Sequence, residues 1–464
     1  MKLHLAFASA TALGLVMATG AFADENEAYL LQDGTGNSAS VTQNSNAIAG
    51  NQAGTSTDAV NQTGSGNVLV ILQSGDSGQI GVKTGTDEYH TPPINLSPNP
   101  PQFTLTYNGV NQTSSGAGSN TATLTQNGNG SVIGQLQQTS TGKALGNSAT
   151  VTQTDANAVN HIFQTQNSAT VGNVINATQT GSGNTIDRID QRGSGAGTNN
   201  SINVNISGSN NGTMDLTGLG GFYSSRAWAA GATQSALFQN NYGSTSGVID
   251  PATVQGNVIS LTISGDANQF GMTQKGSNNT TGTVLISGDS NSFGSYQAGQ
   301  GNIIGAGEIA GNYNDTGIFQ SGSTNSATVS VLASGSDSNA LTIAQLGTTN
   351  TAVVSITGSF NGGGALAGAA GSLVSGSGGW MSPGLILQGG NLSESNNTAN
   401  LTIFGDNNKF AISSLGSDNT VTGNIGSGGG DSDGNSAAVL QNGDNNVASF
   451  SQAGAGSNVV AISQ

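Results

Sequence analysis

The sequence predicts an all-β protein: a single elongated β-solenoid of stacked strand-turn-strand rungs of about 22 residues, interrupted by three loop insertions. A motif, Gln-x-Gly-x-x-Asn-x-Ala-x-x-x-Gln, recurs along the chain, and its second half has the two-residue period of a strand. The chain is also rich in Gly, 73 of 464 residues, and only 5% aromatic. A large aliphatic core is therefore excluded, and a repeated chain of this kind is ordered by backbone and amide hydrogen bonds.

Residues 1–23 are expected to be a secretory signal peptide. Lys2 precedes an apolar run that closes with the small-residue pattern Ala21-Phe22-Ala23, which predicts cleavage between Ala23 and Asp24. The alternative is a buried N-terminal helix. No later apolar run reaches the roughly 18 to 20 residues of a membrane-spanning helix, so we expect a secreted protein, outside the cell or on its surface, with no membrane span after cleavage.

The charge and cysteine content narrow the possible partners and sources of stability. The formal net charge is −16, charged residues make up only 7% of the chain, and there is no cysteine. We therefore expect no nucleic-acid partner, and we expect stability without disulfide bonds.

The first repeats lie in residues 24–82 and show how one rung is built. Ala28, Leu30 and Gln32 are expected to point inward along one strand, the turn at 33–36 reverses the chain, and the segment 37–43 returns as a second strand. Stacked at about 4.8 Å per rung, such repeats place Gln over Gln and Asn over Asn, so that each side-chain amide donates to one neighbour and accepts from the other.

Two sets of residues follow from this arrangement. The candidate ladder residues are Gln32, Asn37, Gln43, Gln62, Asn67, Gln73, Gln274, Asn279, Gln297, Asn302, Gln320, Asn325, Gln345, Asn350, Gln441, Asn446 and Gln452. The candidate turn glycines, which suit positive φ, are Gly34, Gly64, Gly276, Gly299, Gly322, Gly347 and Gly443.

Three stretches lose the pattern and divide the chain into repeat blocks. Residues 83–108 hold five of the 7 prolines and are expected to form a loop extruded from the stack. The other two insertions are 213–250, with Trp228, and a Gly-rich stretch at 362–397, with Trp380. The repeat blocks between them are 109–212, which is irregular, 251–361, and 398–464. The repeats amount to about 15 rungs, or some 70 Å of stack.

The chain offers little for catalysis, and we expect no enzyme, no cofactor and no metal site. Beyond the signal peptide the histidines are His90 and His161. The cluster Asp87-Glu88-Tyr89-His90 is interpreted as a solvated loop without partners, and His161 as a tolerated strand position. A hydrolase would need one of these histidines to meet a nucleophile and a carboxylate, and no nucleophile elbow is present.

Two further patterns have a structural and a functional interpretation. Gly-Asp-x-Asn turns are interpreted as Asx-turns, with calcium binding as the alternative. They lie at 265–268, 288–291, 405–408 and 443–446. Thr-x-Thr pairs at 121–125 and 148–152 suggest an ice-binding ladder, but they recur in few repeats, and the strand preference of Thr accounts for them.

The export signal and the tandem motif resemble curlin, the subunit of bacterial curli fibres. Residues 32–43 and 441–452 match the motif at every specified position, and 62–73 matches with Leu69 in place of Ala. The resemblance implies nucleated self-assembly into an extracellular functional amyloid for biofilm matrix and adhesion. It implies as partners other copies or related curlin-like subunits, a secretion channel, a nucleator, and host or abiotic surfaces. It also implies that Gln32, Asn37, Gln43, Gln441, Asn446 and Gln452 support stacking between copies.

Two functions remain open at this point. In the first, the protein polymerises, and the motif-like segment 458–464 offers an open strand edge to the next copy. In the second, the protein is a secreted monomeric solenoid adhesin that binds a surface through the insertions at 213–250 and 362–397. Persistently monodisperse, β-rich protein would exclude the first.

Overall fold

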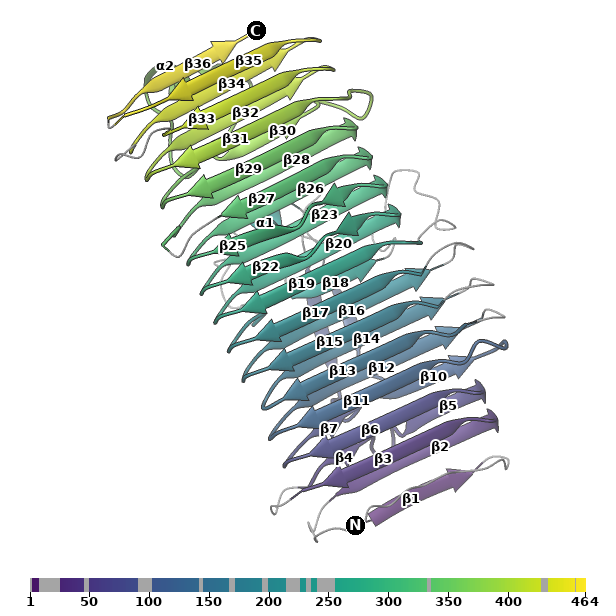
Figure 1. Cartoon of the computed structure of the whole chain (residues 1–464). Coiled ribbons are helices and arrows are strands. Elements are labelled where there is room, and N and C mark those ends of the chain that lie inside the picture. Colours follow the sequence, from purple (N-terminus) through teal and green to yellow (C-terminus); the bar gives the residue numbers. More distant parts are fainter. Residues whose placement is uncertain are drawn as a thin grey trace.

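The computed structural model confirms a β-solenoid, in which the chain runs back and forth between two sheets that face each other along the molecule (Figure 1). It describes residues 2–7, 26–45, 50–90, 102–141, 145–166, 172–193, 199–213, 226–230, 235–239, 255–331, 335–426, 433–454 and 456–464. About 13 coils are stacked, slightly fewer than the 15 expected. The expected signal cleavage at Ala23 and Asp24 lies outside the described residues.

The larger sheet, called sheet A, has 18 strands. They are β1 (Lys2–Phe7), β2 (Glu27–Thr35), β4 (Gln52–Ala53), β5 (Val60–Ser65), β7 (Gln79–Ile80), β10 (Val110–Ser114), β12 (Val132–Ser140), β14 (Ala158–Gln166), β16 (Thr185–Gly193), β18 (Ala236–Gln239), β20 (Gln269–Ser277), β23 (Ser292–Gln300), β26 (Asp315–Ser323), β28 (Ala340–Thr348), β30 (Leu385–Gln388), β32 (Lys409–Leu415), β34 (Ser436–Asn442) and β36 (Val459–Ser463).

The other sheet, called sheet B, has 16 strands. They are β3 (Ser38–Asn44), β6 (Val68–Ser74), β11 (Thr121–Asn127), β13 (Ser148–Thr154), β15 (Val174–Thr180), β17 (Ser201–Ser207), β19 (Val258–Ser264), β21 (Thr280–Thr281), β22 (Val284–Ser287), β24 (Ile303–Ile304), β25 (Gly307–Ala310), β27 (Ser326–Val331), β29 (Thr351–Thr357), β31 (Thr398–Phe404), β33 (Thr420–Ile425) and β35 (Val447–Gln452). The remaining elements are the hairpin strands β8 (Thr86–His90) and β9 (Gln102–Thr106) and two helices, α1 (Arg226–Ala229) and α2 (Gly368–Gly376).

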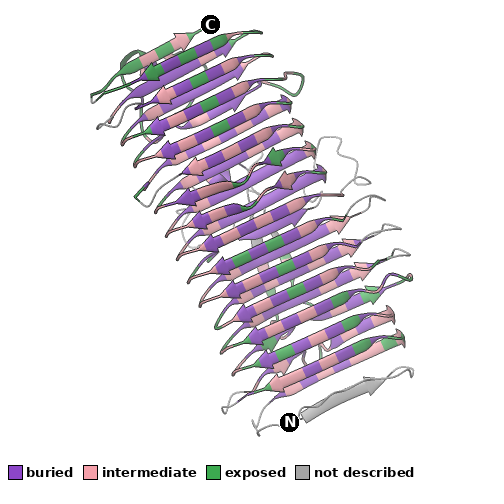
Figure 2. Ribbon diagram, viewed as in Figure 1, coloured by how far each residue is buried: buried purple, intermediate pink, exposed green. Residues whose placement is uncertain are grey.

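Each rung is a sheet A strand, a first corner, a sheet B strand and a second corner that leads to the next rung. Strands of successive rungs pair in parallel and in register, as where Gln274 of β20 lies beside Gln297 of β23. Alternate side chains point inward, which produces the alternation of buried and exposed residues in Figure 2. The inward residues, chiefly Ile, Val, Leu and Ala, form one continuous core between the sheets. The expectation that the chain has no large aliphatic core is therefore wrong, because stacking joins the few apolar residues of each rung into one core.

The irregular block at 109–212 has a structural cause in its sheet A strands. In β16 the backbone N–H groups of Asp187 and Arg188 both donate to Ser235 O, at 2.8 and 3.4 Å, so two residues oppose one as in a β-bulge. The inward residues Ile186 and Ile189 are accordingly three positions apart instead of two. The same spacing separates Ile133 from Leu136 in β12 and Val159 from Ile162 in β14, where it interrupts the period-two pattern of the sequence.

The insertions differ from the expected extruded loops. Residues 83–108 contain the antiparallel hairpin β8–β9, which is tied to the outer face of sheet A. Residues 213–250 contain β18, and 362–397 contain β30, and both are sheet A strands within the stack. The sequence does not predict these short strands because no complete motif follows them. Both helices also pack on sheet A, α1 against β23 and β26, and α2 against β34 and β36. Among the described residues, no helix is long and apolar enough to cross a membrane.

Candidate assembly site

A ladder of Gln side chains runs along the inner face of sheet A, next to the first corner. Each Nε2 donates to the Oε1 of the Gln in the following rung, as from Gln274 to Gln297 at 2.8 Å and from Gln297 to Gln320 at 2.9 Å. The ladder is continuous through Gln32, Gln62, Gln112, Gln138, Gln164, Gln191, Gln239, Gln274, Gln297, Gln320, Gln345 and Gln388. Ser414 replaces the next Gln and donates to Gln441, which in turn donates to Gln464.

A second Gln ladder lies in sheet B, next to the second corner, and is confined to the first rungs. It joins Gln43, Gln73, Gln126, Gln153 and Gln179 at 2.9 to 3.1 Å. Ile206 then takes the position beside Gln179, and apolar side chains fill the column until Ile425 meets Gln452. Stacked Ile needs no amide partner, so core packing replaces the hydrogen-bonded ladder there.

A ladder of Asn side chains occupies every first corner. The backbone N–H of each Asn donates to the Oδ1 of the Asn in the preceding rung, as from Asn302 to Asn279 at 3.1 Å, and many Nδ2 groups do the same. The Asn residues that donate or accept a hydrogen bond of this ladder are Asn37, Asn67, Asn120, Asn147, Asn173, Asn200, Asn257, Asn279, Asn302, Asn325, Asn350, Asn397, Asn419 and Asn446. All the predicted ladder residues therefore lie in this column or in one of the two Gln columns.

Sequence reasoning missed most of an equivalent Asn ladder at the second corner. It comprises Asn157, Asn184, Asn211, Asn268, Asn291, Asn314, Asn339, Asn361, Asn408, Asn435 and Asn458. The available signal was the last residue of the Gly-Asp-x-Asn turns. Three of those turns are second corners, whereas Gly443–Asn446 is a first corner.

The Asp residues of these turns bond along the stack through backbone groups. The N–H of Asp266 donates to Asp289 Oδ1 at 2.8 Å, and the N–H of Asp289 donates to Asn312 Oδ1 at 2.8 Å. Each of these side-chain oxygens thus accepts from a backbone N–H of the preceding rung, 23 residues away, whereas the bond of an Asx-turn joins residues two positions apart. Within the part of the chain that the structure describes, no three His, Cys, Asp or Glu side chains gather in a group that could hold a metal ion.

The predicted turn glycines all have positive φ, and close stacking adds a second requirement. Gly299 has φ of 112°, and a Cβ at this position would lie 1.9 Å from the carbonyl oxygen of Gly322 in the following rung. The corners therefore require Gly both for the backbone angle and for the approach of the next rung.

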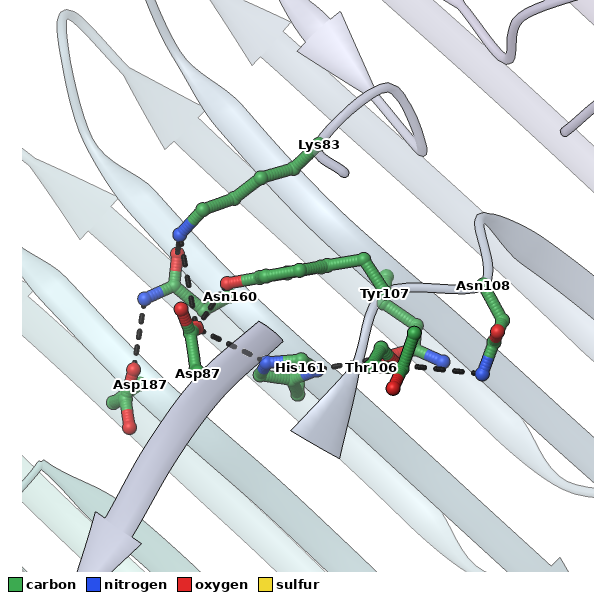
Figure 3. Close-up of polar contacts among 9 residues, drawn as sticks. Lys83, Asp87, Thr106, Tyr107, Asn108, Asn160, His161 and Asp187 are labelled. Atoms are coloured by element: carbon green, nitrogen blue, oxygen red, sulfur yellow. Dashed lines mark hydrogen bonds and ion pairs between the residues drawn. The ribbon is translucent and has the colours of Figure 1, made fainter. Parts of the chain in front are cut away.

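A polar cluster lies on the outer face of sheet A where the β8–β9 hairpin region covers it (Figure 3). His161 is 0% exposed, its Nε2 lies 3.1 Å from Asp87 Oδ2, and its Nδ1 lies 2.7 Å from Gln135 Oε1. The Tyr107 ring stacks on the imidazole at 4.2 Å, and its hydroxyl donates to Asp87. The expectation that Asp87 lies in a solvated loop without partners is therefore wrong, because the hairpin folds back onto β14.

Charges reinforce this cluster. Burial favours a raised pKa for Asp87, but the hydrogen bonds of His161 and Tyr107 and the charge of Lys83, 3.7 Å away, outweigh it and lower the pKa. Burial and the same carboxylate raise the pKa of Tyr107. Since both ring nitrogens of His161 are engaged, the arrangement serves to hold the hairpin on the sheet, and activation of a nucleophile would need one nitrogen to be released.

The two ends of sheet B have one unpaired strand edge each among the described strands, and the β3 end leaves a ladder acceptor unsatisfied. Among the described strands, β3 pairs only with β6, and β35 pairs only with β33. The Oε1 of Gln43, at the β3 end, is buried and has no hydrogen-bond partner among the described residues. The Oε1 of Gln452 is also buried without such a partner, because its neighbour in the preceding rung is Ile425. At the β35 end the stack is stepped, because β36 continues sheet A by one strand beyond sheet B.

No model of a known protein family matches this chain, and no curated protein matches it.

Proposed function

We propose that the protein is the subunit of a secreted, curlin-like amyloid fibre in which copies stack end to end through the Gln and Asn ladders. The observation that carries the proposal is the pair of rungs at the ends of sheet B. They contain the two complete motifs, at 32–43 and 441–452, and the first of these rungs leaves the buried Oε1 of Gln43 without a partner among the described residues. A second copy offers a chemically matched amide at the required spacing.

The polarity of the ladders defines how two copies would meet. If β36 is displaced and β2 and β3 of the next copy add to β34 and β35, Gln452 Nε2 faces the orphan Oε1 of Gln43, in the sense that joins Gln43 to Gln73 within one chain. The N–H of Asn37 would likewise donate to Asn446 Oδ1, as Asn446 donates to Asn419. The contact between copies then repeats the contact between rungs.

Removal of a signal peptide during export would be compatible with this end-to-end assembly. Cleavage after Ala23 would remove β1, which pairs with the edge of β2 that the preceding copy would occupy. Proposed partners are therefore other copies or related curlin-like subunits, with a secretion channel and a nucleator during export, and host or abiotic surfaces once the fibre stands outside the cell. Mass spectrometry of the exported protein should find Asp24 at the N-terminus.

The deciding experiment is incubation of the purified protein, followed by thioflavin fluorescence and electron microscopy. We expect fibres, and we expect Gln452→Leu to slow their growth strongly while Ser451→Ala, an exposed neighbour on β35, leaves it unchanged. Circular dichroism checks that both variants keep the β-rich fold. Persistently monodisperse protein would contradict the proposal and favour a monomeric adhesin that acts through its insertions.

A further inference from the structure

The two outer faces of the solenoid are covered very differently. The β8–β9 hairpin, α1 and α2 all lie on sheet A, as their contacts with β14, β26 and β36 show. No described helix or hairpin packs on the outer face of sheet B, where rows of exposed and half-exposed side chains run across the strands (Figure 2). The described parts of the insertions therefore cover the outer face of sheet A and none of them packs on that of sheet B.

The outer face of sheet B is almost free of charge, although the chain carries −16 overall. Among the described strands of this sheet, Glu308 is the one charged residue, and Ser, Thr, Asn and Val fill most outward positions. The strands of sheet A, by contrast, carry Asp187, Arg188, Asp190, Arg192, Lys275 and Asp315, among others. An acidic molecule thus has one broad side on which close approach of a like-charged copy meets little repulsion.

Apolar side chains are also exposed on this face. Val68, Leu72, Ile303, Val353, Phe404 and Val447 are between 38% and 66% exposed. They belong to β6, β24, β29, β31 and β35, so they are spread along the stack. Their burial would add a hydrophobic contribution to a contact that hydroxyl and amide groups otherwise dominate.

The regular spacing of side chains on this face determines which surfaces can fit against it. Side chains recur every rung, about 4.8 Å along the stack, and every second residue, about 6.7 Å across it. A surface that can interdigitate with this grid at every rung needs the same grid, and a second stacked sheet has it. About 13 coils and strands of some 20 Å give about 1,200 Å² per copy, above the roughly 800 Å² per partner of a standard stable interface.

We propose that the outer face of sheet B docks against the same face of a second copy of this chain, so that stacks associate laterally in pairs with the β8–β9 hairpin, α1 and α2 facing outward. This contact is independent of end-to-end growth, because it uses the side of the stack and none of the ladder residues. In a fibre it pairs two filaments, and in a preparation without fibres it pairs two monomers.

The test places a negative charge in the middle of the face at two distant rungs. Thr150→Glu on β13 combined with Val353→Glu on β29 brings like charges into the paired face, whereas Ser375→Glu adds the same charge to the exposed side of α2, over sheet A. Sedimentation velocity of the purified protein should show a dimer that the double variant weakens by roughly 100-fold or more and that Ser375→Glu leaves unchanged. In fibres, electron microscopy should show paired filaments for wild type and single filaments for the double variant.

A Thr150→Ser, Val353→Thr variant, which keeps the face uncharged, should restore pairing, and circular dichroism should be the same for all variants. Wild type that sediments as a monomer at every concentration and forms only single filaments would overturn the proposal. The proposal would also be overturned if Ser375→Glu weakened the dimer as much as the double variant does. Lateral dimers without fibres would support it while contradicting end-to-end growth, so the two proposals fail separately.

Discussion

Inside the stack a buried Gln side chain is satisfied by hydrogen bonds because another Gln lies in the rung before it and in the rung after it. The amide of Gln297 accepts from Gln274 and donates to Gln320, and the chain supplies both partners by repeating one residue. Because these amides are buried, an interrupted ladder leaves polar groups that water cannot reach. The residue type at a ladder position is therefore fixed by its neighbours rather than by its own rung.

Replacing Gln297 by Leu should test this dependence. The change keeps the size of the side chain but leaves Gln320 Oε1 without its donor and Gln274 Nε2 without one acceptor. Each buried polar group left without a hydrogen-bond partner costs about 1 to 3 kcal/mol, so we expect the free energy of unfolding to fall by about 2 kcal/mol or more. Denaturant titration measures the loss, and Gln300→Ala, at an exposed position of the same strand, serves as control. Equal stability of the two variants would show that the ladder is not a source of stability.

The corner glycines depend on the neighbouring rung in the same way. In Gly299→Ala the new Cβ would lie 1.9 Å from Gly322 O at a φ of 112°, so the two rungs must separate locally. We expect a loss of about 3 kcal/mol or more and faster hydrogen exchange in β23 and β26. Gly363→Ala, where a Cβ meets nothing within 4 Å, should change neither. Unchanged exchange in Gly299→Ala would contradict this account of the corners.

The site residues that sequence reasoning found, and those it missed, follow from what a local pattern contains. Gln274, Gln297 and Gln320 were predictable because a full corner with Gly and Asn follows each of them. Gln239 and Gln388 were not, since an insertion interrupts their rungs and only the register of the sheet places them in the ladder. Ladder partners are 22 or more positions apart in sequence, so a rung that departs from the motif gives no local sign that its residues belong to the ladder.

Among the elements, strands with the regular two-residue period were predictable, whereas bulged strands and the hairpin were not. A bulge adds one residue to a strand and shifts the phase of everything after it, which is why 109–212 looked irregular. The hairpin reaches β14 through Asp87 and Tyr107, and His161 is 74 residues from Asp87 in sequence. Spacing within a loop carries no information on such a contact, so a solvated loop was the natural but wrong expectation.

Docking of the hairpin should depend on pH through Asp87. Its pKa is lowered in the folded protein, so the carboxylate contributes stability that is fully present above the unfolded pKa, about 3.9, and is lost as pH falls through the folded value. Wild type should therefore exceed Asp87→Asn in melting temperature near neutral pH, and the difference should shrink below about pH 4. Asp289→Asn, at an exposed corner, is the control. A difference that persists at low pH would mean that the charge of Asp87 is not responsible.

At the scale of the whole molecule, the fold class was predictable because one short motif contains the two-residue period of the strands, the glycine of the corner and the Gln and Asn of the ladders. The difference between the two sheets in what covers them was not predictable, because the sequence does not show on which side an insertion leaves the stack. That difference matters for assembly. Among the described residues, sheet A carries the hairpin, both helices and most charges of the strands, while the strands of sheet B are nearly uncharged. Large insertions are therefore compatible with close association of stacks, contrary to what their size alone suggests.

The step at the β36 end leads to the last prediction, which concerns growth of the proposed fibre. β36 pairs with β34 along the edge that β2 of the next copy needs if β3 is to add to β35, so the two strands compete for one position. β36 is short, and although α2 packs on it, Val460 and Ile462 are only partly buried against the core. Removing residues 454–464 should therefore expose the β34 edge, with Gln441 ready to donate, and speed fibre growth.

Thioflavin kinetics on wild-type seeds would measure this effect, with growth several-fold faster for the truncated protein than for the full chain. Changing Val460 and Ile462 to Ser, which weakens the docking of β36 without removing it, should give an intermediate rate. Slower growth after truncation would mean that β36 is itself part of the growing end, so that the incoming copy must first supply a sheet B strand opposite it. The sign of the rate change thus distinguishes a strand that blocks the edge from one that extends it, because the same Gln ladder is available in both cases.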